Sequence, residues 1–176
     1  ACAMLLSATM DRMTPEQRHR CMSQVRSKDT GPEWTVRRMV HAMGFRYRLH
    51  VSSLPGKPDL VLTRHRKIIF VNGCFWHAHG CLSARKVPAT HPRFWTEKFA
   101  RNVERDRKVL GQLWSDGWHV LVVWECETKD PGRLSAILSA FLKPSRGPVN
   151  YALDDQHALY EQAAESRVEY GFENES

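Results

Sequence analysis

The side chains most able to do chemistry in this sequence lie in one ten-residue stretch, Asn72-Gly73-Cys74-Phe75-Trp76-His77-Ala78-His79-Gly80-Cys81. It holds two thiols and two imidazoles, and Cys and His at such close spacing are typical of a metal site. It also holds two neighbouring aromatic rings, which are unusual in a metal loop and favour a surface that grips something flat. The stretch therefore predicts a site for stability and a site for chemistry on one loop.

The cysteine spacing predicts a tetrahedral zinc site. Cys74 and Cys81, with either His77 or His79, supply three ligands, and Cys126 at the end of a distant apolar run is the best fourth. Three Cys and one His close the coordination sphere, so the zinc would be structural rather than catalytic. The alternative is three free buried thiols. Spacing leaves open which histidine ligates, and the other would be free to act as a general base or acid near neutral pH.

The charge of the chain is unevenly spread. Residues 1–150 hold 25 of the 26 Lys and Arg but 12 of the 19 acids, whereas residues 151–176 hold one Arg and seven acids. A basic body predicts a polyanionic partner, with nucleic acid ahead of an anionic membrane surface. We expect a basic N-terminal arm over residues 1–30, one domain over 31–143, and an acidic, mobile tail over 144–176.

Membrane insertion and secretion are not expected. No window approaches the roughly 18 apolar residues of a transmembrane helix, and the opening Ala1–Leu6 is too short and uncharged for a signal peptide. The expected location is therefore the cytosol. There, five cysteines are more often metal ligands or free thiols than a disulfide framework.

Hydrophobic periodicity predicts the elements that position the focal stretch. Strands are expected at 45–51, 59–62, 67–71 and 118–124, and helices at about 31–43, 93–116 and 131–143, with a short helix opening at Thr14. Asp59 begins an apolar strand, and its simplest interpretation is a turn aspartate. Glu33 is in the first turn of a helix, where a cap is the simplest role. Trp95, Asn102 and Asp106 share one face of the long helix, and a core position is the simplest interpretation of Trp95.

Six motifs resemble, in order and spacing, those of the very short patch repair endonucleases of the Vsr type. They are Pro58-Asp59, Asn72-Gly73-Cys74-Phe75-Trp76-His77, Lys86-Val87-Pro88, Phe94-Trp95, Asn102-Val103-Glu104-Arg105-Asp106 and Val123-Trp124-Glu125-Cys126. The resemblance implies a restriction-endonuclease-like α/β fold, with a central mixed sheet flanked by helices and a structural zinc site. It implies a monomeric, Mg²⁺-dependent enzyme of the bacterial cytosol and nucleoid, with mismatch-repair proteins as partners. The substrate would be double-stranded DNA with a T:G mismatch left by deamination of 5-methylcytosine, nicked 5′ to the T.

The resemblance also implies roles for individual residues. Asp59 and the backbone carbonyl of Val71 would bind the catalytic Mg²⁺, and His77 would activate water. Glu33 and Asp106 would orient that histidine or hold metal-bound water. Cys74, His79, Cys81 and Cys126 would bind zinc. Phe75, Trp76 and Trp95 would form a wedge that intercalates beside the mismatch, and Asn102 would also contact DNA.

One position departs from the family pattern. Asn72 stands where the related enzymes place a histidine, and Phe70 stands where restriction-type folds place an acid. An amide can orient metal-bound water or the scissile phosphate, but it does not accept a proton at neutral pH. Two other functions therefore stay open: a zinc-stabilised DNA-binding module without cleavage, and a restriction-like nuclease that cuts matched sites.

Overall fold

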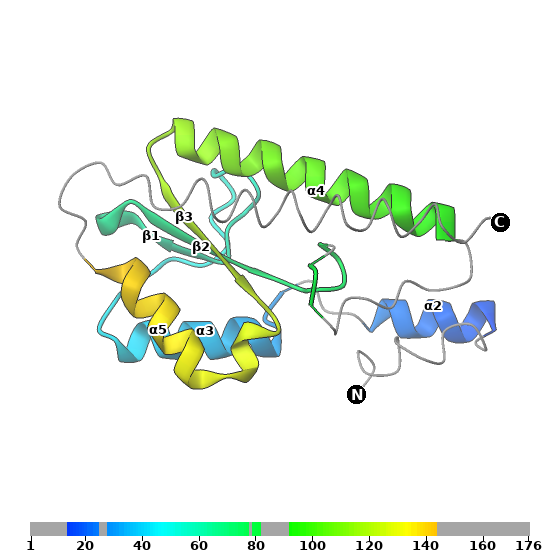
Figure 1. Ribbon diagram of the computed structural model, residues 1–176, viewed down its shortest axis with the longest axis horizontal. Coiled ribbons are helices and arrows are strands. Elements are labelled where there is room, and N and C mark those ends of the chain that lie inside the picture. Colours follow the sequence, from blue (N-terminus) through cyan, green and yellow to red (C-terminus); the bar gives the residue numbers. More distant parts are fainter. Residues whose placement is uncertain (1–13, 25–27, 78, 82–91, 144–176) are drawn as a thin grey trace.

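A three-stranded mixed sheet lies at the centre of the fold (Figure 1). A computed structural model describes residues 14–24, 28–77, 79–81 and 92–143 of the chain. The strands are β1 (Leu60–Leu62), β2 (Lys67–Asn72) and β3 (His119–Trp124), in the order β1-β2-β3. β1 is antiparallel to β2, and β2 is parallel to β3. The predicted α/β class and mixed sheet are therefore confirmed.

The register of the sheet brings the focal stretch beside the last predicted metal ligand. The predicted hairpin forms through a 3₁₀ turn, η2 (Thr63–His65). In the parallel pair, Asn72 lies opposite Trp124. The chain leaves β2 directly into Gly73 and Cys74, and it leaves β3 toward Cys126 and the turn η4 (Glu127–Lys129). Residues about fifty positions apart in sequence therefore meet at one end of the sheet.

Two helices cover one face of the sheet and one helix covers the other (Figure 1). α3 (Gly31–Ala42) and α5 (Pro131–Leu142) pack on the first face, and α4 (Pro92–Ser115) packs on the second. Alternate strand residues point to opposite faces. Leu60, Ile69 and Val123 thus join the core with α3 and α5, whereas Val61 and Ile68 pack against Leu113 of α4.

The helices begin where their caps predict. Thr30 and Glu33 form a reciprocal capping box at the start of α3, so the capping role expected for Glu33 is present. The Asp130 side chain accepts from the Arg133 N–H at the start of α5. The short helix expected at Thr14 is α2 (Pro15–Ser23), and Figure 1 shows it standing away from the sheet, toward the end where α4 begins.

The strand predicted over residues 45–51 is wrong. This segment makes one isolated antiparallel bridge, Arg48 with Val61, and no ladder. The alternation of apolar and basic residues reflects a half-buried extended segment. It leaves the sheet at His50, where φ of +47° takes the backbone out of the extended region. The turn at Leu54–Lys57 then returns the chain to Asp59.

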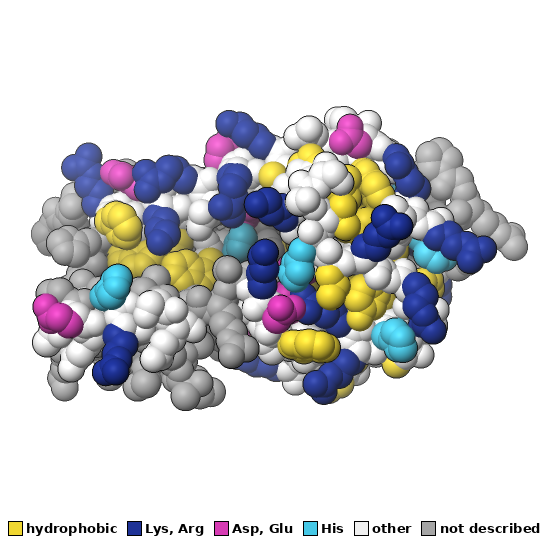
Figure 2. All heavy atoms as spheres, turned by 180° about the vertical axis from the view of Figure 1, so that it is seen from behind, with side chains coloured by type: hydrophobic (Ala, Val, Ile, Leu, Met, Phe, Trp, Pro, Cys, Tyr) yellow, Lys and Arg dark blue, Asp and Glu magenta, His cyan; other side chains and the backbone are white. Residues whose placement is uncertain are grey.

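Two predicted regions lie partly or wholly outside the described residues. They are residues 1–13 and 25–27 of the basic arm, and the whole acidic tail over 144–176. Within the described ranges, no helix is both long and apolar enough to cross a lipid bilayer. Seen from behind, the described surface carries many Lys and Arg side chains and few acids (Figure 2), in keeping with the basic body expected from the sequence.

Candidate active site and metal centre

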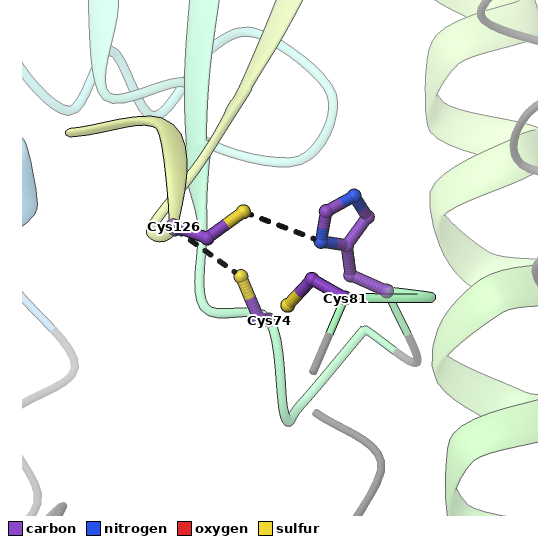
Figure 3. Close-up of side chains that lie close together, drawn as sticks. Cys74, Cys81 and Cys126 are labelled. Carbon is purple, nitrogen blue, oxygen red and sulfur yellow. Dashed lines mark hydrogen bonds between the residues drawn. The ribbon is translucent and has the colours of Figure 1, made fainter. Parts of the chain in front are cut away.

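Three thiols and one imidazole converge at the end of the sheet. The ligand atoms of Cys74, His79, Cys81 and Cys126 all lie within 4.8 Å of one another. Figure 3 shows the three sulfurs pointing toward one another, from the loop after β2 and the turn after β3. His79 Nδ1 is 3.6 Å from Cys126 Sγ, and the Cys126 N–H donates to Cys74 Sγ at 3.3 Å. The His79 ring is stacked on Trp124, with a centroid distance of 4.2 Å, which fixes its orientation.

The chemistry of this donor set fits a structural zinc ion. Zn–S and Zn–N bonds of about 2.3 and 2.0 Å place tetrahedral ligands within 4 Å of each other, close to the spacing here. Burial raises the pKa of the Cys74 and Cys126 thiols, and nearby Cys81 raises both further. A bound cation would offset that cost, because coordinated thiols lose their protons. The donor set is sulfur-rich and has no vacant corner for a substrate.

A second pair of side chains lies on the same loop. Nδ1 of His77 contacts Oδ2 of Asp106, which α4 presents. The other carboxylate oxygen, Oδ1, accepts from Arg105 at 3.1 Å. With Nδ1–H facing the carboxylate, the imidazole keeps Nε2 as its proton acceptor. The side chains are 18% and 14% exposed, so the histidine reaches solvent while its partner is largely shielded.

Asp59 stands at the start of β1, against the end of β2. Its Oδ2 accepts from the Val71 N–H at 2.8 Å. Burial raises the pKa of Asp59 to about 6, and the nearby Glu33 charge adds to that, whereas the Val71 N–H acts in the opposite direction. The carboxylate is thus held in place and only partly hydrated. A bound cation would stabilise its ionised form.

Glu33 lies in a different group. Its carboxylate accepts from the Thr30 hydroxyl at 2.9 Å, from the Asp29 N–H at 3.0 Å and from Arg37 Nη2 at 2.7 Å. These bonds go to the capping turn and to α3 rather than to His77. Arg37 is 2% exposed and also pairs with Asp29. Glu33 therefore acts on Asp59 through its charge, since it raises the pKa of that carboxyl.

The predicted wedge residues pack against one another. Phe75 lies edge-on to Trp76, Trp95 and Phe99, with ring centroids 5.0 to 5.4 Å apart. Trp95 is 7% exposed, so it occupies a core position as well. The ammonium of Lys98 lies 5.2 Å from the Trp76 ring and 5.3 Å from the Trp95 ring, which places a cation over this aromatic cluster.

The two asparagines singled out in the sequence lie near these groups. The Asn102 amide donates to the Trp76 carbonyl at 2.8 Å and so ties α4 to the aromatic loop. Asn72 is 8% exposed at the end of β2, between Val71 and the Cys/His loop. Asn102 therefore supports the loop that carries His77, whereas Asn72 is the strand residue that leads into that loop.

Sequence reasoning missed three residues of this region. Lys98 lies one turn after Phe94 and Trp95 on α4, a spacing that could have revealed it. Arg37 lies four residues after Glu33, which is also a helical pairing signal. His50 gives no local signal, because its neighbours come from other segments of the chain.

The site combines a histidine held by a carboxylate, a buried second carboxylate and an aromatic cluster, which is a set of groups able to activate water. The profile of the family described as DNA mismatch endonuclease Vsr matches residues 10–83. The chain is 46% identical over 135 residues to the type II nicking enzyme V.XorIIP of Xanthomonas oryzae pv. oryzae, spanning 77% of this chain and 98% of that relative.

Two further relatives agree. The DNA mismatch endonuclease Vsr of Escherichia coli K12 is 42% identical over 118 residues, spanning 67% of this chain and 75% of the relative. The type II nicking enzyme V.HpaIIP of Haemophilus parainfluenzae is 32% identical over 153 residues, spanning 86% and 97%. The chain belongs to the Vsr family of DNA mismatch endonucleases, as its motifs predicted.

Proposed function

We propose that this DNA endonuclease nicks the T-containing strand of a T:G mismatch, on the 5′ side of the T, by metal-assisted hydrolysis. The observation that carries the proposal is the contact of His77 with Asp106 on a loop that also bears an aromatic cluster. His77 would act on the scissile phosphate, and the aromatic rings of the same region would contact the bases. The mixed sheet with helices on both faces is consistent with a restriction-endonuclease-like core.

Asp59 and the Val71 carbonyl are the proposed ligands of Mg²⁺. The N–H and C=O of one residue in a strand point to the same side. Because the Val71 N–H bonds the Asp59 carboxylate, the Val71 carbonyl faces the same region. Carboxylate and carbonyl oxygens with completing waters are the donors that Mg²⁺ prefers beside a phosphate. A bound Mg²⁺ would neutralise charge that develops on the phosphate oxygens.

His77 is the proposed general base. Asp106 holds Nδ1–H, so Nε2 takes a proton from water as the water oxygen attacks phosphorus. The phosphorus–oxygen bond to the leaving sugar oxygen then breaks, and that oxygen takes a proton from solvent water. Asp106 stabilises the imidazolium that forms, in the way a carboxylate does in a catalytic triad. Asn72, at the end of the same strand, would orient the phosphate or metal-bound water.

Phe75, Trp76 and Trp95 are the proposed wedge. Unstacking a base step costs a few kcal/mol and less at a mismatch, so inserted rings select for deformable sites. Lys98 above these rings and Asn102 behind them would keep the wedge rigid in the free protein. Trp95 would serve as both the base of the cluster and part of the contact surface.

Zinc is the proposed occupant of the Cys/His centre. It would join the loop after β2 to the turn after β3, and so hold the His77 loop without taking part in hydrolysis. Ser and Ala replacements of its ligands should therefore act on activity through stability. Variants of the zinc ligands should therefore lose stability, whereas variants of Asp59 should lose activity alone, so experiments can distinguish the two metal sites.

A nicking assay on a T:G duplex with Mg²⁺ tests this function. The native chain should nick, whereas Asp59→Ala and His77→Ala should bind the duplex with native affinity and leave it intact. Tight binding by an inert native chain would favour the DNA-binding module instead. Equal cleavage of a fully matched duplex would favour a restriction-like nuclease.

A further inference from the structure

A buried arginine joins three segments near Asp59. Arg37, on α3, pairs with Asp29 before that helix and with Glu33 one turn away, and its Nη2 lies 3.1 Å from Nε2 of His50. Asp29 and His50 both have left-handed backbones, with φ of +54° and +47°. Non-glycine residues in that region cost about 1 kcal/mol or more and persist where the surroundings impose them. Here both contact the same guanidinium.

This cluster is not a second metal site. Ligand atoms of Asp29, Glu33 and His50 lie within 4.8 Å of one another, which by itself would fit a cation. The Arg37 guanidinium already lies among them, with direct contacts to all three. A divalent ion there would meet a fixed positive charge at the same carboxylates. The Arg37 guanidinium therefore already supplies the positive charge that the two carboxylates need.

The contact with Arg37 fixes the tautomer of His50. A guanidinium donates hydrogen bonds and has no acceptor, so Nε2 of His50 is the acceptor at 3.1 Å. The nearest oxygen of Asp29 is 3.7 Å from the same nitrogen, beyond hydrogen-bond distance. The ring proton is thus on Nδ1, on the other side of the ring. Within the described part of the chain, Nδ1 has no hydrogen-bond partner, and the side chain is 25% exposed.

The segment that ends at His50 runs back toward the proposed metal carboxylate. Arg48 bridges Val61 in antiparallel fashion, which lays this segment alongside the start of β1, and the pairing ends after that one bridge, at His50. Glu33 lies near both residues: its carboxylate is within 4.8 Å of a ring nitrogen of His50, and its charge adds to the burial that raises the pKa of Asp59. Arg37, which contacts His50, also lies near enough to Asp59 to act against the effect of burial and lower its pKa through space. His50 thus lies near the proposed metal carboxylate.

We propose that His50 is a further substrate-contacting residue, whose Nδ1–H donates to a non-bridging oxygen of the scissile phosphate, and that Arg37 is the positioning residue that holds it in this tautomer. The inference rests on the proposed endonuclease function and extends it. A neutral imidazole donor adds no charge to compete with Mg²⁺ at Asp59. Its hydrogen bond would stabilise the negative charge that develops on the phosphate oxygens in the transition state.

Two substitutions of His50 and one control variant test the donor separately from the backbone. His50→Gly removes the donor and favours the left-handed conformation. His50→Asn keeps an N–H donor and also tolerates that conformation. His41→Ala, at an exposed position of α3, is the matched control. Each variant is assayed in single turnover on a T:G duplex with Mg²⁺, together with duplex affinity and thermal stability.

The expected result is a loss of about 100-fold in the single-turnover rate of His50→Gly, the size typical of one lost transition-state donor. Duplex affinity and melting temperature should stay near native, His50→Asn should recover much of the rate, and His41→Ala should match the native chain. A native rate in His50→Gly would overturn the inference. So would a rate loss in His50→Gly and His50→Asn alike that follows their loss of stability, because that is a structural role.

A sulfur substitution tests the contact itself. Replacing the non-bridging oxygen that His50 contacts should slow the native enzyme, and that slowing should disappear in His50→Gly. Equal thio effects in both proteins would contradict a contact to either oxygen. If the native chain does not nick T:G duplex at all, the proposed function fails first. If the native chain nicks and the His50→Gly variant nicks equally well, only the present inference fails.

Discussion

At the scale of single residues, the buried carboxylate of Asp59 lowers the stability of the folded protein and is also the proposed ligand of the catalytic metal. Its folded pKa of about 6 lies above the ordinary value of 3.8, because the carboxylate is buried. The folded protein therefore prefers the protonated form. At a pH below the ordinary pKa, Asp59 is protonated in both the folded and the unfolded chain and does not change the free energy of unfolding. As the pH rises from the ordinary pKa through 6, the free energy of unfolding falls. At neutral pH the metal-free protein carries the whole penalty, which bound Mg²⁺ would relieve.

Asp59→Asn should therefore stabilise the metal-free protein while it abolishes nicking. We expect a gain of about 1–3 kcal/mol in the free energy of unfolding at neutral pH, from the size of the pKa shift. The gain should shrink as pH falls toward the ordinary carboxyl pKa of 3.8. Urea unfolding at both pH values measures it. A variant less stable than the native chain at neutral pH would show that the carboxylate is structurally favourable, contrary to this account.

The contact between His77 and Asp106 gives a second prediction at this scale. Asp106→Asn keeps the shape but removes the carboxylate that fixes the tautomer of His77 and stabilises its charged form. The nicking rate should fall by about 10²–10⁴-fold while duplex affinity is preserved. Glu104→Gln is the matched control, since this exposed acid of α4 pairs only with Lys108 among the described residues. Equal rates in the two variants would remove Asp106 from the mechanism.

At the scale of elements, the Cys/His centre decides how the loop after β2 is held. The parallel pairing of β2 and β3 brings that loop to Cys126, and a zinc ion held by the four residues of the centre would close the connection. His77 lies between the proposed ligands Cys74 and His79, so a bound ion would constrain its position from both sides. Loss of the ion should therefore disturb catalysis indirectly, by releasing the loop.

Cys126→Ser should remove zinc and destabilise the fold. Structural zinc is worth about 10–16 kcal/mol in peptide sites, so we expect a loss of more than about 3 kcal/mol in unfolding free energy. Elemental analysis of the purified protein should give one zinc per native chain and none for the variant. Cys2→Ser, outside the described residues, should keep both metal and stability. A native chain without zinc, equally stable with a chelator, would favour three free thiols.

Most elements could be predicted from the sequence because their signals are local. Caps at Thr30 and Asp130 and the apolar runs of the three strands are each contained in one segment. The expected strand at 45–51 failed, because alternation records burial on one side and does not supply a partner strand. Backbone conformation at His50 ended the pairing after one bridge.

The candidate site was predictable to the extent that it lies on one loop. Spacing predicted the Cys/His set but left His77 and His79 equivalent, and only the packing of the loop separates them: His79 lies with the cysteines, whereas His77 contacts Asp106 of α4. The cluster of Arg37 with Asp29 and His50 was invisible for the same reason, since it depends on where three segments meet. Roles implied by family resemblance, such as Asp59 in metal binding, rest on motif position and stay predictions.

At the scale of the whole molecule, the basic surface predicts salt-sensitive binding (Figure 2). Each phosphate neutralised on duplex DNA contributes about −0.9 to the slope of log affinity against log salt concentration. Fluorescence anisotropy with a T:G duplex in the absence of Mg²⁺ should give a steep negative slope. The slope for a matched duplex should be similar, because phosphate contacts do not read sequence. A flat response would contradict nucleic acid as the partner.

Mapping the position of the nick shows whether the enzyme acts on the T-containing strand of a T:G mismatch. The native chain is incubated with Mg²⁺ and duplexes labelled on one strand or the other, carrying T:G, T:A or C:G at one position. We predict a single cut in the T-containing strand of the T:G duplex, on the 5′ side of the T, and no cut by the His77→Ala variant. Cleavage of the G-containing strand, or equal cleavage of the matched duplexes, would contradict it.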